Sequence, residues 1–194
     1  MNKRFNQLTK ISLVLIYLVI IAGAIVRMTG SGMGCPDWPK CFGYYIPPSE
    51  ESDLIFKSNH DYKSNQMIIL NNEKLYTAKS DFRSSNEINL NNWILYEKHN
   101  YVTYNPVHTW IEFINRLIGA IAGIFTILML LMSLKYWKEN KNITLISLLV
   151  VLGMGFQAWL GKLVVDSNLA PYKITVHMLM ALVIVGLIIY LIYT

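Results

Sequence analysis

The sequence predicts an all-α membrane protein, an up-down bundle of four transmembrane helices with a long outer loop between the first and second helices. Three observations predict this fold class. The 194 residues are 54% apolar and only 15% charged, whereas a soluble domain carries about 25% charge. Four runs are apolar enough to cross a hydrocarbon layer, which takes roughly 20 helical residues each. Basic residues flank these runs on one side.

The spans predicted by the hydropathy pattern are about residues 8–27, 110–134, 143–165 and 172–193. Two lysines and an arginine flank the beginning of the first span, and three further lysines lie between the second and third. By the positive-inside rule these flanks are cytoplasmic. We therefore expect a multi-pass protein of the cell membrane with both termini in the cytoplasm and residues 28–107 outside.

The first run has an alternative interpretation as a cleaved signal peptide, because Ala22-Gly23-Ala24 could serve as a cleavage site. Apolarity continues through Ile25 and Val26, however. Removal of the run would also leave three spans with a less consistent charge pattern. We therefore expect a retained first span.

The outer segment is predicted to have two parts. Residues 28–48 are rich in Gly, Pro, Trp and Tyr, which is typical of an ordered loop, whereas residues 49–100 are rich in Asn, Ser, Lys and Glu with few apolar clusters. We expect the second part to be a mobile, variable insertion. Its histidines, His60 and His99, are expected to be plain solvated residues.

Composition also excludes some classes of partner and scaffold. The net charge is +5, but the basic residues are scattered and no basic stripe alternates with aromatic residues, so we expect no nucleic-acid partner. Cys35 and Cys41 lie just past the first span, on the oxidising side, where a disulfide is expected. A structural staple, a redox pair that relays electrons and a metal pair remain open, although the spacing is wider than in zinc and thioredoxin motifs.

Ionisable residues inside the expected spans are few, and each is a functional candidate because burying a charge there is costly. They are Arg27, Glu112, Arg116, Lys162 and His177. Each also has a simpler role available. Arg27 and Lys162 lie at span ends and can reach lipid headgroups, Arg116 can pair with Glu112, and His177 can form an interhelical hydrogen bond.

One face of the second span carries His108, Glu112 and Asn115 at steps of four and three. Gly119 and Gly123 continue this face. Small residues there would let a neighbouring helix or a flat ligand approach the backbone.

The third span repeats the pattern with Gly153, Gln157 and Gly161, and the fourth presents His177 near its outer end. Polar groups from three spans would thus converge near the outer surface of the bundle. Two histidines that face each other across a bundle are the usual way to hold a haem iron. The pairing is incomplete here unless His108 supplies the partner.

Four stretches of the sequence match a known family together. They are GAIVRMTGSGMGCPDWPKCFG at 23–43, WIEFINRLIG at 110–119, QAWLGKLVV at 157–165 and ITVHMLMAL at 174–182. In these stretches the chain resembles the haem A synthase family, over all four spans in order. The resemblance implies an eight-span protein of two homologous four-helix halves, of which this chain corresponds to the N-terminal half.

The resemblance implies an oxidoreductase. The N-terminal half would hold haem O, whose ring methyl is oxidised in steps to the formyl group of haem A for cytochrome oxidase assembly, while the other half would hold a haem b. Glu112 matches the essential carboxylate of the family, and His177 matches an axial ligand of the haem iron. Arg27 and Arg116 fall on positions suited to the propionates, and Cys35 with Cys41 matches the cysteine pair of the outer loop.

The chain departs from the family pattern at Asn115, where the family commonly has His. Either His108 substitutes after a shift in register, or the iron is five-coordinate with its open side available to oxygen or water. Glu112 would act as proton acceptor or as the electrostatic stabiliser of a developing carbocation at the methyl carbon.

The second departure is length, since four further spans are missing from this chain. We therefore expect the chain to pair with a second copy of itself or with a second four-helix half. The other expected partners are membrane lipid, haem O synthase and cytochrome oxidase. The alternatives are a non-catalytic haem-binding membrane protein, such as a carrier or assembly factor, and a truncated half that needs a partner.

Overall fold

The computed structural model describes residues 2–70, 74–98 and 103–194, so His99 lies outside the described residues. The chain forms two compact units. The helical unit comprises Met1–Arg27 and Ile114–Thr194, and the inserted unit comprises Met28–Phe113. The two units are described separately below.

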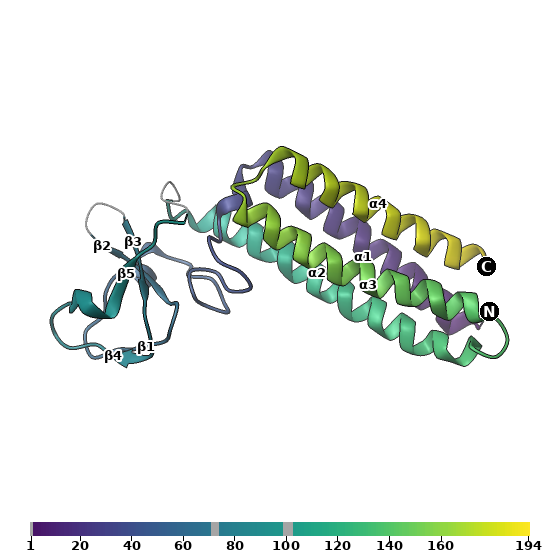
Figure 1. Cartoon of the computed structure of the whole chain (residues 1–194), viewed down its shortest axis with the longest axis horizontal. Helices are drawn as coiled ribbons and strands as arrows, with labels where there is room; N and C mark the ends of the chain where they lie inside the picture. The colour runs from purple at the N-terminus through teal and green to yellow at the C-terminus, as the bar shows by residue number, and fades with distance from the viewer. Residues whose placement is uncertain (1, 71–73, 99–102) are drawn as a thin grey trace. The chain divides into compact units, whose positions relative to one another are not determined.

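Four long helices run side by side in the helical unit (Figure 1). They are α1 (Lys3–Met28), α2 (Pro106–Ser133), α3 (Lys141–Asp166) and α4 (Pro171–Tyr193). All four are long and apolar enough to cross a membrane. The start of α1 and the end of α4 lie at the same end of the bundle (Figure 1), as an up-down arrangement of four helices requires. The predicted fold class is confirmed.

Local sequence signals explain where the helices begin. The Asn105 side chain accepts hydrogen bonds from the backbone N–H groups of Val107 and His108, and Pro106 occupies the first helical position of α2. Asn140 caps α3 in the same way, through the N–H of Asn142. Asparagine caps and an N-terminal proline both favour helix initiation, because the first turn has N–H groups without helical partners.

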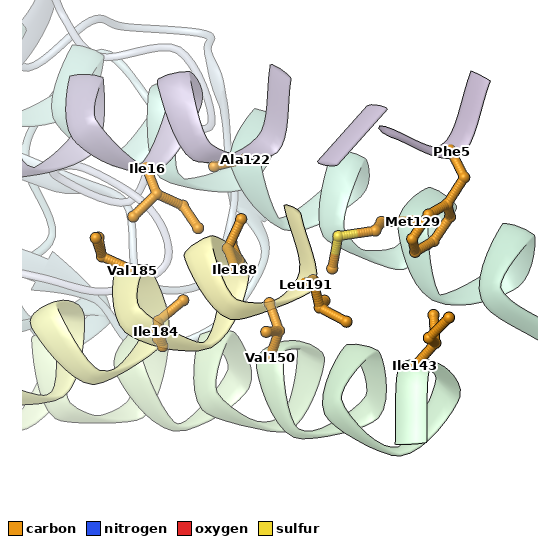
Figure 2. Packing of buried hydrophobic residues seen from close by; sticks show 10 residues of the cluster. All are labelled: Phe5, Ile16, Ala122, Met129, Ile143, Val150, Ile184, Val185, Ile188 and Leu191. Atoms are coloured by element: carbon orange, nitrogen blue, oxygen red, sulfur yellow. The ribbon is translucent and has the colours of Figure 1, made fainter. Parts of the chain in front are cut away.

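One apolar cluster joins all four helices, and its side chains point toward one another in Figure 2. Its buried members are Phe5, Ile16, Ala122, Met129, Ile143, Val150, Ile184, Val185, Ile188 and Leu191. Phe5 and Ile16 of α1 belong to this core, so α1 packs as part of the bundle, and retention of the first span stays a prediction. The ring of Phe5 also packs edge-on against Tyr136, with the ring centroids 5.4 Å apart.

The core fills only one part of the bundle. Together with its partly buried neighbours, the cluster reaches Ile20 on α1, Ala122 on α2, Met154 on α3 and Met180 on α4. We call the remainder the His177 half: residues 21–27, 114–121, 155–166 and 171–179. Among its described residues, the buried apolar side chains are Leu160 and Val165 of α3, and neither belongs to the cluster.

The described residues of the inserted unit form five short strands in two antiparallel sheets. The strands are β1 (Asp61–Tyr62), β2 (Met67–Leu70), β3 (Lys74–Ala78), β4 (Phe82–Arg83) and β5 (Trp93–Leu95). One sheet pairs β1 with β4, and the other has the order β2-β3-β5.

The described part of residues 49–100 contains an apolar cluster that its composition did not indicate, whereas its mobility and variability stay predictions. Tyr62, Ile68, Ala78 and Trp93 form a buried cluster of their own. Antiparallel pairing brings together residues that are isolated from one another in the sequence. Strands of two to five residues are too short to show a clear alternation of apolar and polar positions, so sequence periodicity could not reveal them.

Candidate functional site

The loop after α1 is closed by a disulfide. Cys35 and Cys41 are bonded, as predicted, and both are buried. The Asp37 carboxylate tightens this loop by accepting hydrogen bonds from the backbone N–H groups of Phe42 and Gly43, at 2.6 and 2.8 Å. In this oxidised state neither sulfur is a thiolate that could bind a metal, and the structural, redox and metal-binding roles of the pair stay predictions.

Glu112 ties this loop to the first turns of α2. Its side chain is buried, and its Oε2 atom accepts a hydrogen bond from the backbone N–H of Cys35 at 2.8 Å. The Thr109 hydroxyl, one turn earlier on the same helix face, donates to the carbonyl oxygen of Gly34 at 2.8 Å. The predicted catalytic carboxylate therefore also holds the disulfide loop in place.

Gly34 allows the loop and helix to approach. A Cβ atom at this position would lie 2.4 Å from the carbonyl oxygen of His108 and 2.8 Å from the nitrogen of Thr109. Real Cβ atoms do not come that close to backbone atoms. The sequence did not single out Gly34, Asp37 or Thr109, although the first two lie within the stretch that carries the family resemblance.

A second group of predicted residues meets between α3 and α4, in the helical unit. The Gln157 Nε2 group donates a hydrogen bond to the backbone oxygen of His177 at 3.1 Å. A Cβ atom on Gly161 would lie 3.4 Å from Nε2 of the His177 ring, and one on Gly153 would lie 3.1 Å from Cγ1 of Ile184. The predicted close packing against the glycine face of α3 is confirmed.

Asn115 lies near α1, also in the helical unit. A Cβ atom on Gly23 would lie 3.9 Å from the Asn115 Oδ1 atom. This oxygen is buried and has no hydrogen-bond partner within the described part of the chain. Gly119 and Gly123 continue the same face of α2, and a Cβ atom on either would meet nothing within 4 Å.

The remaining candidates lie at less enclosed positions. Arg27 in the last turn of α1 and Lys162 near the end of α3 are exposed, as expected for side chains that reach headgroups. His108 and Arg116 of α2 are half-buried. His60 is exposed, as predicted, with its ring edge-on to Tyr62. The convergence of all predicted polar groups at one place stays a prediction.

The donor set of the helical unit is compatible with haem. No group of three or more His, Cys, Asp or Glu residues that could hold a metal ion occurs among the described residues. A haem iron needs only one or two axial ligands from the protein, because the porphyrin supplies the rest. His177 can supply one such ligand. The glycines beside it and the buried amide oxygens of Asn115 and Gln157 lie in the same region, which the apolar core leaves out.

A separate hollow of about 200 Å³ lies in the inserted unit. Its lining includes Tyr44, Pro47, Asp53, Lys57 and His60. The volume is below the range of roughly 300–1,000 Å³ that is usual for ligand pockets. This hollow is therefore not a candidate for a ligand as large as haem.

The fold and the helical site together define a multi-pass membrane protein with a single imidazole between packed helices. The family model of cytochrome oxidase assembly proteins, COX15-CtaA, matches residues 6–82 and 64–194. The chain belongs to this family.

Curated relatives named heme A synthase agree with this membership. The protein from Shewanella oneidensis is 26% identical over 176 residues, which cover 91% of this chain and 41% of that protein. The protein from Ehrlichia canis is 27% identical over 181 residues, which cover 87% of this chain and 43% of that protein. A shorter match, 46% identical over 43 residues, covers 22% of this chain and 14% of the protein from Geobacillus kaustophilus. The chain thus matches less than half the length of each of these relatives.

Proposed function

We propose that this chain forms a haem-binding four-helix half of a haem A synthase. Its substrate is haem O, and the reaction oxidises a ring methyl of haem O to the formyl group of haem A. The relatives named heme A synthase support this assignment. Because they are more than twice as long, the proposal includes a second four-helix half, supplied by the same polypeptide, a second copy or a separate chain.

The observation that carries the proposal is the change of packing along the bundle. The apolar core ends at Ile20, Ala122, Met154 and Met180, and the His177 half beyond it contains glycine faces and unpaired buried amide oxygens instead. A buried amide oxygen without a partner costs about 1–3 kcal/mol. A large, flat and mostly apolar ligand that carries an O–H group would satisfy one of those oxygens.

The iron ligand in this proposal is His177 alone. Helix α2 is continuous from Pro106 to Ser133, so no shift in register moves His108 to the position of Asn115, about 10 Å farther along the axis. An amide is a poor ligand for haem iron. Of the two alternatives left open by the sequence, the continuous helix supports the one in which His177 would be the single residue that holds the iron.

Glu112 is the proposed catalytic residue. As a buried carboxylate it can accept a proton that is released during the oxidation or stabilise positive charge that develops at the methyl carbon. Its hydrogen bond from Cys35 fixes the position of one carboxylate oxygen. Arg27 and Arg116 are the proposed partners of the haem propionates.

The proposal is tested by purifying the protein from membranes in detergent, recording its reduced haem spectrum, and extracting and identifying the haem. The wild type should contain haem O or haem A, and His177→Ala should lose it, while His60→Ala, at an exposed histidine of the inserted unit, should keep it. Glu112→Gln should keep haem O and make no haem A. A wild type without haem, or an unchanged spectrum in His177→Ala, would contradict the proposal.

A non-catalytic haem carrier is the second candidate. The hydrogen bond from the backbone N–H of Cys35 to Glu112 favours this candidate, because it gives the carboxylate a structural role that does not require catalysis. Glu112→Gln discriminates between the two, since a carrier would bind and release haem as the wild type does. An enzyme would accumulate the unoxidised substrate.

A further inference from the structure

Gln157 lies in a tight contact between α3 and α4. It is 9% exposed, and the glycines one turn before and one turn after it bring the two helices close together. Its Nε2 group donates to the backbone oxygen of His177. The side chain is therefore anchored at the level of the proposed iron ligand.

This anchor determines which way the amide faces. The backbone oxygen of His177 can only accept hydrogen bonds, so the NH₂ group of Gln157 must face it. The Oε1 atom then points away from that backbone oxygen. It is buried and has no hydrogen-bond partner in the part of the chain that the structure describes.

The chemistry of Oε1 restricts what can satisfy it. A carbonyl oxygen accepts hydrogen bonds and repels a carboxylate, so a haem propionate is not its partner. An O–H group is suitable. Haem O carries a hydroxyl group on the carbon that joins its isoprenoid tail to the ring, whereas haem b has a vinyl group there.

We propose that the Oε1 atom of Gln157 accepts a hydrogen bond from the hydroxyl group of bound haem O and so selects hydroxyalkyl haem over haem b. This inference rests on the proposed function. It assigns Gln157 two roles. The Nε2 group positions α4 at His177, and the Oε1 atom distinguishes haem O from haem b by a hydrogen bond. The other possible O–H donor at this place is a water molecule.

Relative affinity tests the proposal without reference to catalysis. Haem-free protein in detergent is titrated with haem O and with haem b, for the wild type and for Gln157→Met. Loss of the hydrogen bond from Nε2 to His177 should weaken the binding of both haems, whereas loss of Oε1 should weaken only the binding of haem O. The preference for haem O should therefore fall about three- to tenfold, as expected for one hydrogen bond. Gln7→Met, at an exposed glutamine of the same unit, should leave the preference unchanged.

Equal weakening of both haems in Gln157→Met would overturn the proposal and assign Oε1 to water. A second measurement needs no variant: wild-type protein should bind the O-methyl ether of haem O, which has no O–H group, more weakly than haem O. Equal binding of the ether would also overturn it. Protein that binds haem O selectively but forms no haem A would contradict the proposed catalysis and leave this inference intact.

Discussion

At the scale of single residues, the contact between the disulfide loop and α2 requires glycine at position 34, which has no side-chain methyl group. Gly34 lies against the backbone of His108 and Thr109, and the hydrogen bonds from Cys35 to Glu112 and from Thr109 to Gly34 form only at this short distance. The backbone of a helix cannot move aside without breaking its own hydrogen bonds. A side chain at this position would therefore separate the loop from α2.

Replacing Gly34 by Ala should destabilise the inserted unit by about 1–3 kcal/mol or more, the range for inserting an atom into a packed interior. Thermal unfolding in detergent measures the change. Gly186→Ala is the matched control, because a Cβ atom there meets nothing within 4 Å. Equal melting temperatures for the two variants would show that the loop accommodates the methyl group.

Tyr44 should make the stability of the inserted unit depend on pH in the alkaline range. Burial, with smaller contributions from Tyr62 and Asp53, raises the pKa of Tyr44 to about 12, from about 10 in an unfolded chain. Below pH 10 the phenol is neutral in both states. Between about pH 10 and 12 only the unfolded chain loses the proton, so stability is lost as the pH rises.

A titration of phenolate absorbance checks this prediction. The difference between the wild type and Tyr44→Phe should have its midpoint near pH 12. The part of the absorbance change that titrates near pH 12 should remain in Tyr45→Phe. That variant removes a phenol that is 78% exposed. A midpoint near pH 10 for the Tyr44 difference would contradict the buried environment.

At the scale of elements, the short strands are held by aromatic packing. The ring of Trp93 on β5 packs edge-on against Tyr62 on β1 and Phe82 on β4, at centroid distances of 5.0 and 5.4 Å. These contacts connect the two sheets. Strands of two or three residues make too few backbone hydrogen bonds to be stable without such contacts.

Trp93→Ala should therefore open the inserted unit, since removing a buried aromatic side chain costs about 3–5 kcal/mol. Limited proteolysis should cut the variant faster within this unit, while circular dichroism shows the helices retained. Trp38→Ala, at a tryptophan that is 44% exposed, should be cut like the wild type. Equal rates for both variants would exclude the aromatic cluster as the main support of the strands.

At the scale of the whole molecule, four spans and one long insertion define a topology that can be measured. The α2–α3 turn is rich in lysine, which predicts a cytoplasmic position for it by the positive-inside rule. Each span reverses direction, so the inserted unit between α1 and α2 should lie on the opposite side.

Labelling of single introduced cysteines with a membrane-impermeant maleimide tests this topology. The native cysteines do not interfere, because they are bonded to each other. Ser58→Cys, at an exposed position of the inserted unit, should react in intact cells, whereas Lys138→Cys, exposed beside the α2–α3 turn, should react only after the membrane is opened. Labelling of Lys138→Cys in intact cells would reverse the proposed orientation.

The sequence by itself determined the four helices and the position of the disulfide. Each of these depends on residues that are close in the chain: an apolar run long enough to cross a membrane, or two cysteines six positions apart. The strands of residues 61–95 escaped prediction because their apolar residues are few and isolated until they pair.

Only the tertiary structure decided what the candidate residues contact. The bond between Glu112 and Cys35 joins residues 77 positions apart, and Gln157 reaches His177 across 20 positions. The sequence placed Glu112 and Gln157 on suitable helix faces but could not show that the first holds the disulfide loop, or that the second keeps an unpaired oxygen beside the proposed ligand. Such contacts depend on where glycines let two backbones approach, which is a property of the packed chain and not of either segment alone.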